Sequence, residues 1–334
     1  MTDTSGRSPR QQRLAQVSTT EAGVHSIASA APPAGSDVPV VDEHGMAGEA
    51  SGQIRTIARR FFHDPQALIG TIVFFGMAIA AILVGQFWTY SYTAITDTLN
   101  APPSAAHPFG TNTIGGDVFA QVMRGTLQDI EIALVVALLA TVIGTLVGAV
   151  AGFYGGRVDS ILMRFVDLIL VIPVLVVLIV LAHIVAKQTN NWFWLAIIIG
   201  ALSWPYVARL VRADFLTLRE RDFVEASRAL GASDRRLISR HLLPNAVGPI
   251  IVNATITVAL SIVLESTLSF LGLGIQPPNV SLGLLIDQGQ DSATTEWWLF
   301  VFPVLFLIVL ILAVFFIGDG LREALDPKKN RVRS

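Results

Sequence analysis

The sequence has no cysteine and only three lysines among its 334 residues. The absence of cysteine excludes disulfide bonds, thiolate metal ligands, a cysteine nucleophile and a lipid-modified cysteine. The lysines matter because a phosphate-binding loop ends in Gly-Lys-Ser or Gly-Lys-Thr. None of Lys187, Lys328 and Lys329 follows a glycine. The chain therefore has no such nucleotide-binding loop, and we assign it no catalytic site.

Charged residues are also scarce. They make up 14% of the chain, against 52% hydrophobic residues, whereas a soluble domain has about 25% charged residues. The composition therefore predicts a protein of the lipid bilayer. The net charge of −2 gives no attraction to nucleic acid. The six histidines are scattered, without a pair at metal-ligand spacing, so we expect no metal site.

Six apolar stretches are long enough to be transmembrane helices. About 20 helical residues rise about 30 Å, the thickness of the hydrocarbon layer. The stretches lie near residues 67–88, 130–152, 161–186, 193–212, 247–269 and 298–318. We therefore expect an all-α membrane protein with six transmembrane helices within residues 67–320.

The segments outside these stretches differ in composition. Residues 1–50 are rich in Ser, Thr, Gly, Pro and Ala, which indicates a disordered cytoplasmic tail. Residues 51–66 place apolar side chains on one helical face beside three arginines, a pattern typical of an amphipathic helix at the membrane interface. Residues 321–334 are expected to form a cytoplasmic C-terminal tail.

Basic residues are distributed unequally between the two sides of the predicted spans. With the N-terminus inside, all Lys and Arg residues except Arg124 and Lys187 fall in inner segments. Cytoplasmic loops of membrane proteins carry such an excess of positive charge. The distribution predicts a multi-pass protein of the cytoplasmic (inner) membrane. Both termini and the loop 214–245 would then lie in the cytoplasm.

The loop 214–245 contains two short helical patterns separated by Gly231. The first pattern has apolar and charged residues on opposite faces. The apolar face is Phe223, Ala226 and Leu230, and the charged face is Asp222, Glu225 and Arg228. Glycine suits the bend because it accepts a positive φ without strain, and we expect Pro244 to end the second helix. The arrangement is typical of a docking surface for a soluble partner.

The same loop resembles a known family. The pattern Glu-Ala-Ala, three residues, Gly, nine residues, Ile-x-Leu-Pro marks the membrane subunits of ATP-binding-cassette importers. The positions in register with it are Glu225, Ala226, Gly231, Leu243 and Pro244, and the departures are Ser227 and His241. Further stretches resemble the dipeptide, oligopeptide and nickel branch: residues 107–111, 203–205, 268–278 and 318–327. The resemblance covers roughly residues 60–330.

The resemblance implies a type I importer permease fold in which this chain forms half of a translocation path. It implies a homologous second permease and an extracytoplasmic solute-binding protein. It also implies two cytoplasmic ATPases, which would bind the ATP and magnesium, so that this chain would hold no cofactor. The residues that would couple to the ATPases are Phe223, Glu225, Ala226, Leu230, Gly231, Ala232, Leu243 and Pro244.

The substrate implied by the resemblance is a di- or oligopeptide. A nickel chelate, haem or another small solute is the alternative within the same machinery. An ion-driven secondary transporter is the alternative of another class, and it would need ionisable groups at the bilayer midplane. Glu265 and Asp167 are the two deep candidates in the predicted spans. They could instead be structural carboxylates, with Asp167 paired to Arg164 one turn earlier.

Two further groups of residues also have two interpretations. Gly144, Gly148 and Gly152 form a stripe of small residues, which would pack either against the second permease or within this subunit. On the outer side three residues depart from the family pattern: Gly116, Asp129 and Glu131. The family has arginine at the first position and small or hydroxyl residues around the others. We expect Asp129 and Glu131 to form a solvated rim, which could also attract a cationic peptide terminus.

Overall fold

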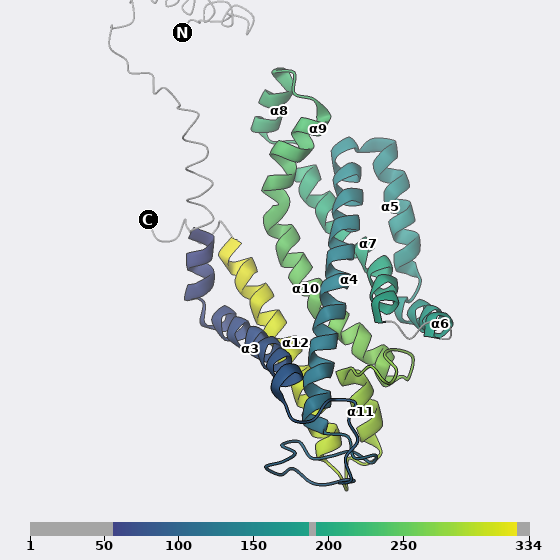
Figure 1. Cartoon of the computed structure of the whole chain (residues 1–334). Coiled ribbons are helices and arrows are strands. Elements are labelled where there is room, and N and C mark those ends of the chain that lie inside the picture. The colour runs from purple at the N-terminus through teal and green to yellow at the C-terminus, as the bar shows by residue number, and fades with distance from the viewer. Residues whose placement is uncertain (1–55, 187–191, 326–334) are drawn as a thin grey trace, which may run out of the picture. The chain divides into compact units, whose positions relative to one another are not determined.

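The computed structural model describes residues 56–186 and 192–325, which form helices joined by loops (Figure 1). The predicted N-terminal tail and most of the predicted C-terminal tail lie outside the described residues. A short helix over residues 56–63 falls within the predicted amphipathic segment. The helices that follow are α3 Pro65–Phe87, α4 Val118–Tyr154, α5 Gly156–Val171, α6 Val174–Ala186, α7 Trp192–Leu218, α8 Asp222–Ala229, α9 Asp234–Leu237, η2 Ile238–Leu242, α10 Leu243–Phe270, α11 Leu282–Gln290 and α12 Trp298–Leu325.

Within the described residues, five helices are long and apolar enough to cross a membrane. They are α3, α4, α7, α12 and the continuous run Asp234–Phe270. A sixth span is formed if α5 and α6 count as one, and the two are bent by 77°. The apolar stretch 161–186 is thus not one straight helix. Ile172 adopts extended backbone with ψ 128°, because a residue before proline, here Pro173, avoids the α conformation.

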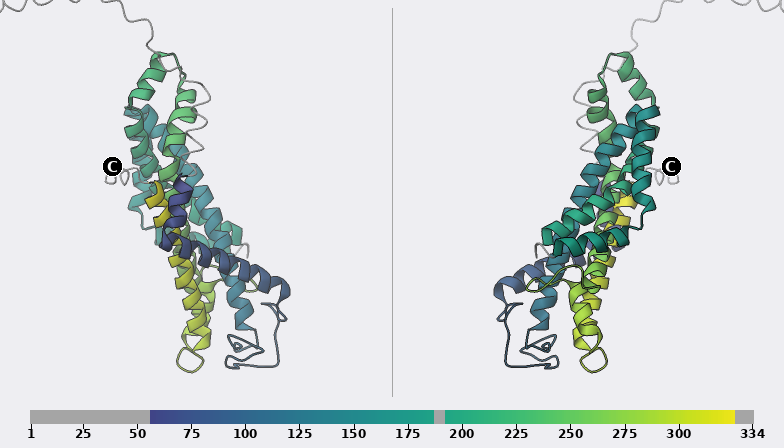
Figure 2. Two further views of the ribbon diagram at one scale, coloured as in Figure 1. Left: turned by 90° about the vertical axis from the view of Figure 1, so that its left-hand side faces the viewer. Right: turned by 90° about the vertical axis from the view of Figure 1, so that its right-hand side faces the viewer.

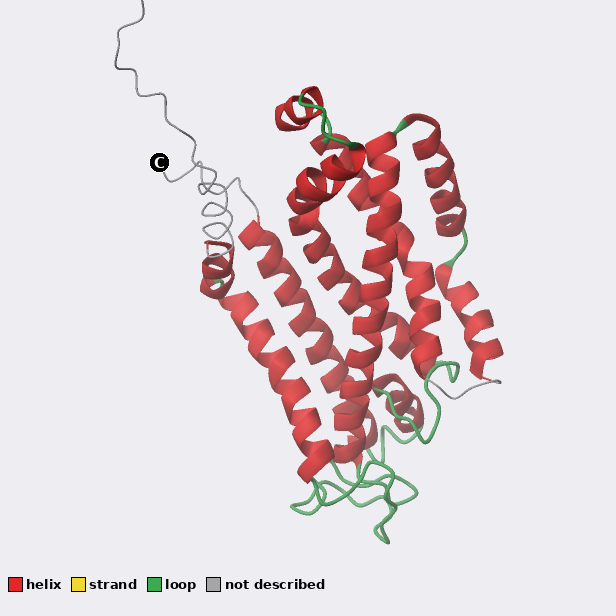
Figure 3. Ribbon diagram, turned by 45° about the horizontal axis from the view of Figure 1, so that its top comes forward, coloured by secondary structure: helices red, strands yellow, loops and turns green. Residues whose placement is uncertain are grey.

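The 37-residue helix α4 packs against α3, α5, α7 and α10 (Figures 1 and 3). It begins at Val118, well before the predicted start of the second span at residue 130. Asp117 is its N-cap, and the Asp117 carboxylate accepts a hydrogen bond from the Ala120 N–H. An N-cap of this kind supplies a partner for a backbone donor that the first helical turn leaves free. The cap therefore extends the helix beyond its apolar part.

The described helices place different segments at their two ends (Figures 1 and 2). α8 and α9 lie at one end, which we call the α8 end. The loop 88–117 and α11 lie toward the opposite end, which we call the loop end. The predicted docking segment is therefore separated by the length of the bundle from the loop 88–117, which carries the family motif at residues 107–111.

No break separates α9, η2 and α10, which run as one helix from Asp234 to Phe270. The prediction that Pro244 ends the second helix is therefore wrong. Residues Ile238–Leu242 form a π turn, in which the Leu243 N–H donates to the Ile238 carbonyl. Pro244 follows in the first turn of α10. The wider turn changes the hydrogen-bond register just before a residue that has no N–H to donate, so the helix continues through the proline.

Candidate functional site

Val224 attaches α8 to the rest of the chain. Its side chain has no exposed area and belongs to a cluster with Phe215 of α7, Leu237 of α9 and Leu242 of η2. Val224 was not among the predicted site residues, because the apolar face predicted for α8 does not include position 224. One signal was available: Val224 is the only β-branched residue in α8.

The predicted apolar face of α8 is not covered by the part of the chain that the structure describes. Leu230 is 89% exposed and Phe223 is 40% exposed. Ala226 and Glu225 beside them are exposed as well. A group of exposed apolar side chains on a short helix is typical of a surface that a partner buries. The remaining predicted coupling residues in this region are half-buried or exposed: Ala232, Leu243 and Pro244.

Gly231 forms the turn after α8. Its φ is +82°, which confirms the predicted bend with a positive φ. The Gly231 N–H donates to the Arg228 carbonyl at 2.9 Å, and the Ala232 N–H donates to the Ser227 carbonyl at 3.1 Å. These two bonds make a Schellman C-cap. A Cβ at position 231 would meet no atom within 4 Å, so the backbone conformation alone favours glycine there.

Arg212 of α7 and Arg219, which directly follows α7, link the α8 end to the neighbouring helices. Arg212 binds the Asp159 carboxylate of α5 through both Nε and Nη2, with an Nη2–Oδ2 distance of 2.6 Å. Arg219 donates from Nη1 to the Gly152 carbonyl of α4 at 3.1 Å. A bidentate Arg–carboxylate pair fixes the relative orientation of its two helices. These contacts tie the end of α7 that precedes α8 to α4 and α5.

Asp167 does not pair with Arg164. Its Oδ1 instead accepts a hydrogen bond from Arg209 Nη2 of α7 at 2.5 Å, so the expected partner is wrong. A partner on a neighbouring helix replaces one on the same helix, and sequence spacing alone does not reveal such a contact. The two side chains are 55% and 51% exposed, so the pair lies on the surface of this chain. The pathway role of Asp167 stays a prediction.

The glycine stripe of α4 packs against α7 of the same chain. A Cβ at Gly144 would lie 2.5 Å from Val207 Cβ, and one at Gly148 would lie 2.4 Å from the Ala208 carbonyl oxygen. At Gly152 the Phe215 Cβ would be 2.6 Å away. Of the two interpretations, the structure therefore shows the internal one, and the three glycines present no free face to a second permease.

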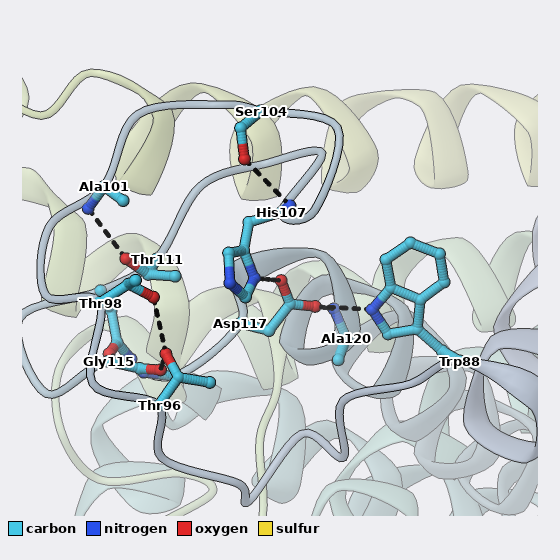
Figure 4. Close-up of polar contacts among 12 residues, drawn as sticks. Trp88, Thr96, Thr98, Ala101, Ser104, His107, Thr111, Gly115, Asp117 and Ala120 are labelled. Atoms are coloured by element: carbon cyan, nitrogen blue, oxygen red, sulfur yellow. Dashed lines mark hydrogen bonds and ion pairs between the residues drawn. The ribbon is translucent and has the colours of Figure 1, made fainter.

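Asp117 joins three segments at the loop end (Figure 4). Its Oδ1 lies 2.8 Å from Nδ1 of His107, and its Oδ2 accepts a hydrogen bond from Trp88 Nε1 at 2.9 Å. The ring of Tyr90 lies 4.5 Å from the His107 ring, between centroids. His107 and Asp117 are both buried. The motif at residues 107–111 thus anchors the loop 88–117 to the start of α4.

Of the three residues that depart from the family pattern, Asp129 and Gly116 are buried and Glu131 is half-buried. Asp129 has no exposed area, so the expectation of a solvated rim is wrong for this residue. Glu131 is half-buried and pairs with Arg124 at 3.4 Å. At Gly116 a Cβ would approach Gln121 Nε2 to 2.7 Å. The burial of Asp129 could not be predicted from the sequence, because the residues that cover it belong to α10 and α11, more than a hundred positions away.

Glu265 also has no exposed area. It accepts hydrogen bonds from the hydroxyls of Ser269, at 2.6 Å, and Ser266, at 3.4 Å. These contacts within the subunit favour the structural interpretation of this carboxylate, and its gate role stays a prediction. Within residues 56–186 and 192–325, no three His, Asp or Glu side chains are grouped so that they could hold a metal ion. The absence of a cofactor stays an expectation.

The described helices define a multi-pass membrane protein with a short helix, α8, that exposes apolar side chains at one end. Residues 144–331 match the family described as the binding-protein-dependent transport system inner membrane component. Residues 52–103 match the N-terminal transmembrane domain of oligopeptide transport permease C. The chain belongs to this family of permease subunits of ATP-binding-cassette importers. Membership implies ATPase subunits and a partner permease subunit.

Relatives and a solved structure agree with this assignment. The oligopeptide transport system permease protein OppC of Mycobacterium tuberculosis is 38% identical over 278 residues, 83% of this chain and 95% of the relative. A putative peptide permease protein of Brucella suis is 38% identical over 283 residues, 84% of this chain and 92% of the relative. A structure of the MetNI methionine ABC transporter has a TM-score of 0.53 at 20% identity, covering 63% of this chain and 98% of that chain. This last likeness concerns the fold alone.

Proposed function

We propose that this chain is the permease subunit of an ATP-driven importer of di- and oligopeptides and forms half of its translocation path. The observation that carries the proposal is the similarity to relatives named as oligopeptide and peptide permeases, which extends over 95% and 92% of their lengths. These names favour a peptide over a nickel chelate or haem. They also favour ATP-driven import over an ion-driven transporter.

The proposed assembly contains a homologous second permease, two ATPases and an extracytoplasmic solute-binding protein. ATP and magnesium bind to the ATPases, and this chain holds no cofactor. Support comes from the family, which is named for its dependence on a binding protein, and from the lack of a Gly-Lys-Ser/Thr sequence in the chain.

In the proposed coupling mechanism, an ATPase buries the exposed face of α8, including Phe223 and Leu230, with Glu225 beside it. Closure of the two ATPases on ATP then displaces α8. The Gly231 turn and the buried Val224 make α8 move together with α7 and α10. Because packed cores are not freely deformable, a displacement at one end is transmitted as rigid-body motion of helices.

The proposed orientation places the α8 end in the cytoplasm and the loop end outside. Ser233 and Ala105 are exposed residues at these two ends, and the chain has no cysteine to interfere. We expect Ser233→Cys to react with a membrane-impermeant thiol reagent only from the cytoplasmic side, and Ala105→Cys only from outside. Labelling of intact cells and inverted vesicles measures this, and reversed labelling would refute the orientation.

The direct test of the function is uptake by the reconstituted transporter. The two permeases, the ATPases and the binding protein are incorporated into vesicles, and accumulation of a radiolabelled peptide is followed. The proposal requires accumulation that depends on ATP hydrolysis and on the binding protein.

A further inference from the structure

Asp129 of α4 and Glu265 of α10 meet in the interior of the chain. Neither side chain has any exposed area, and the two carboxyl groups are neighbours that act on each other. α4 and α10 pack together at this point, and α11 packs against both. A direct bond between two carboxyl groups needs a proton, because two carboxylates can only accept hydrogen bonds and repel each other.

The two carboxyl groups differ in the donors around them. Glu265 accepts hydrogen bonds from the hydroxyls of Ser269 and Ser266 and is hydrogen-bonded to Ser281 as well. Asp129 accepts one, at Oδ2, from the Leu282 N–H at 3.3 Å. Its buried Oδ1 has no donor. Since hydrogen-bond donors stabilise an ionised carboxylate, the surroundings favour the charge on Glu265 and the proton on Asp129.

No cation of the described helices neutralises this pair through a contact in the structure. Arg124, the one cation of α4, donates to Gln128 and Glu131 instead. Other titratable side chains, apart from tyrosines, also lie on the described helices that pack against α4 or α10. They are Arg157, Asp159, Arg164, Asp167, His183, Arg209, Arg212, Asp214, Arg240, His241, Asp287, Asp319, Arg322 and Glu323. A second buried negative charge without a partner would be strongly destabilising, whereas a neutral acid avoids that penalty.

We propose that Asp129 is an un-ionised acid whose Oδ1–H donates to the Glu265 carboxylate, so that one bound proton joins α4 to α10. The same pair extends to the start of α11. Oδ2 of Asp129 accepts from the Leu282 backbone, and Ser269, which donates to Glu265, also accepts from the Ile275 N–H at 2.9 Å. Asp129 is thus a positioning residue, and its proton holds three segments of the loop end in place.

A consequence of this bond is that the loop end depends on pH. The folded chain keeps a proton that the unfolded chain releases at neutral pH, so folding stability falls as pH rises. Ionisation of Asp129 would place two negative charges side by side and separate α4 from α10. The proton therefore acts as a pH-sensitive connection between helices that the transport cycle moves.

Infrared spectroscopy of the purified full-length protein in lipid nanodiscs tests the proposal. Protein labelled with carbon-13 at aspartate should show the C=O stretching band of an un-ionised carboxylic acid at neutral pH. Asp129→Asn should lose this band while keeping a neutral donor to Glu265. The matched control Glu131→Gln, which changes the neighbouring half-buried carboxylate, should retain it. If Asp129→Asn does not fold, Asp129→Ser provides a second neutral donor for the same measurement.

The thermal unfolding midpoint provides the second measurement. For the wild type it should fall as pH rises from 7 to 9, and Asp129→Asn should lose most of this dependence. Absence of the acid band in wild type at neutral pH would overturn the proposal. A second result would also overturn the proposal: addition of sodium, potassium or calcium chloride raises the unfolding midpoint of the wild type but not that of Asp129→Asn. The pair would then bind a cation in place of the proton.

Discussion

Gly148→Leu should abolish accumulation of the folded membrane domain. A Cβ at this position would lie 2.4 Å from the Ala208 carbonyl oxygen and 2.9 Å from Val211 Cβ. The obstacle is the backbone of α7, which cannot move aside as a flexible side chain could. Overpacking of a core costs about 1–3 kcal/mol or more, and we expect the upper end of that range here. Size-exclusion chromatography and thermal unfolding of the detergent-solubilised protein measure the effect.

Gly76→Leu is the matched control for this substitution. Gly76 lies in the apolar helix α3, and a Cβ there would meet no atom within 4 Å. The control variant should therefore elute and unfold like the wild type. The internal packing of the α4 glycines would be contradicted if Gly148→Leu stayed folded and only released the second permease. That result would restore the interface interpretation of the stripe.

Gly231→Val should remove most of the substrate-stimulated ATP hydrolysis without unfolding the membrane spans. The φ of +82° is unfavourable for a β-branched residue, and forcing it costs about 1–3 kcal/mol. The turn would relax and displace the exposed face of α8 from its position. Because about 1.4 kcal/mol corresponds to a tenfold change, we expect substrate-stimulated ATP hydrolysis by the reconstituted transporter to fall about tenfold or more.

Gly231→Asn separates the backbone effect from any effect of added volume. Asparagine tolerates the left-handed conformation better than other residues with a side chain, and there is open space around position 231. This variant should retain most of the stimulated activity. Equal loss in both variants, or normal transport by Gly231→Val, would contradict the role given to the turn.

Much of the fold could be predicted because the signals are local. Apolar runs of about 20 residues indicate spans, and the positive φ of Gly231 followed from a glycine between two amphipathic patterns. The bend at Pro173 and the passage of the helix through Pro244 depend on the surrounding hydrogen bonds. Proline alone does not reveal whether a helix bends, stops or shifts register, and the two prolines behave differently here.

The candidate site was predicted only in part, for a related reason. The exposed residues of α8 share one short segment, so helical spacing was enough to group them. The anchor Val224, the partner of Asp167 and the burial of Asp129 all depend on contacts between distant segments. Asp129, for example, is bonded to Leu282, which lies 153 positions later in the chain. One sequence without its relatives contains no signal for such a pairing.

Uptake of labelled peptide by the reconstituted transporter tests the account most directly. The complete assembly should accumulate a di- or oligopeptide only when ATP is hydrolysed and the binding protein is present. Gly231→Val should stop this accumulation, and Gly231→Asn should preserve it. Peptide uptake that follows an ion gradient without ATP would contradict the account, as would ATP-dependent uptake of a nickel chelate or haem with no uptake of peptide.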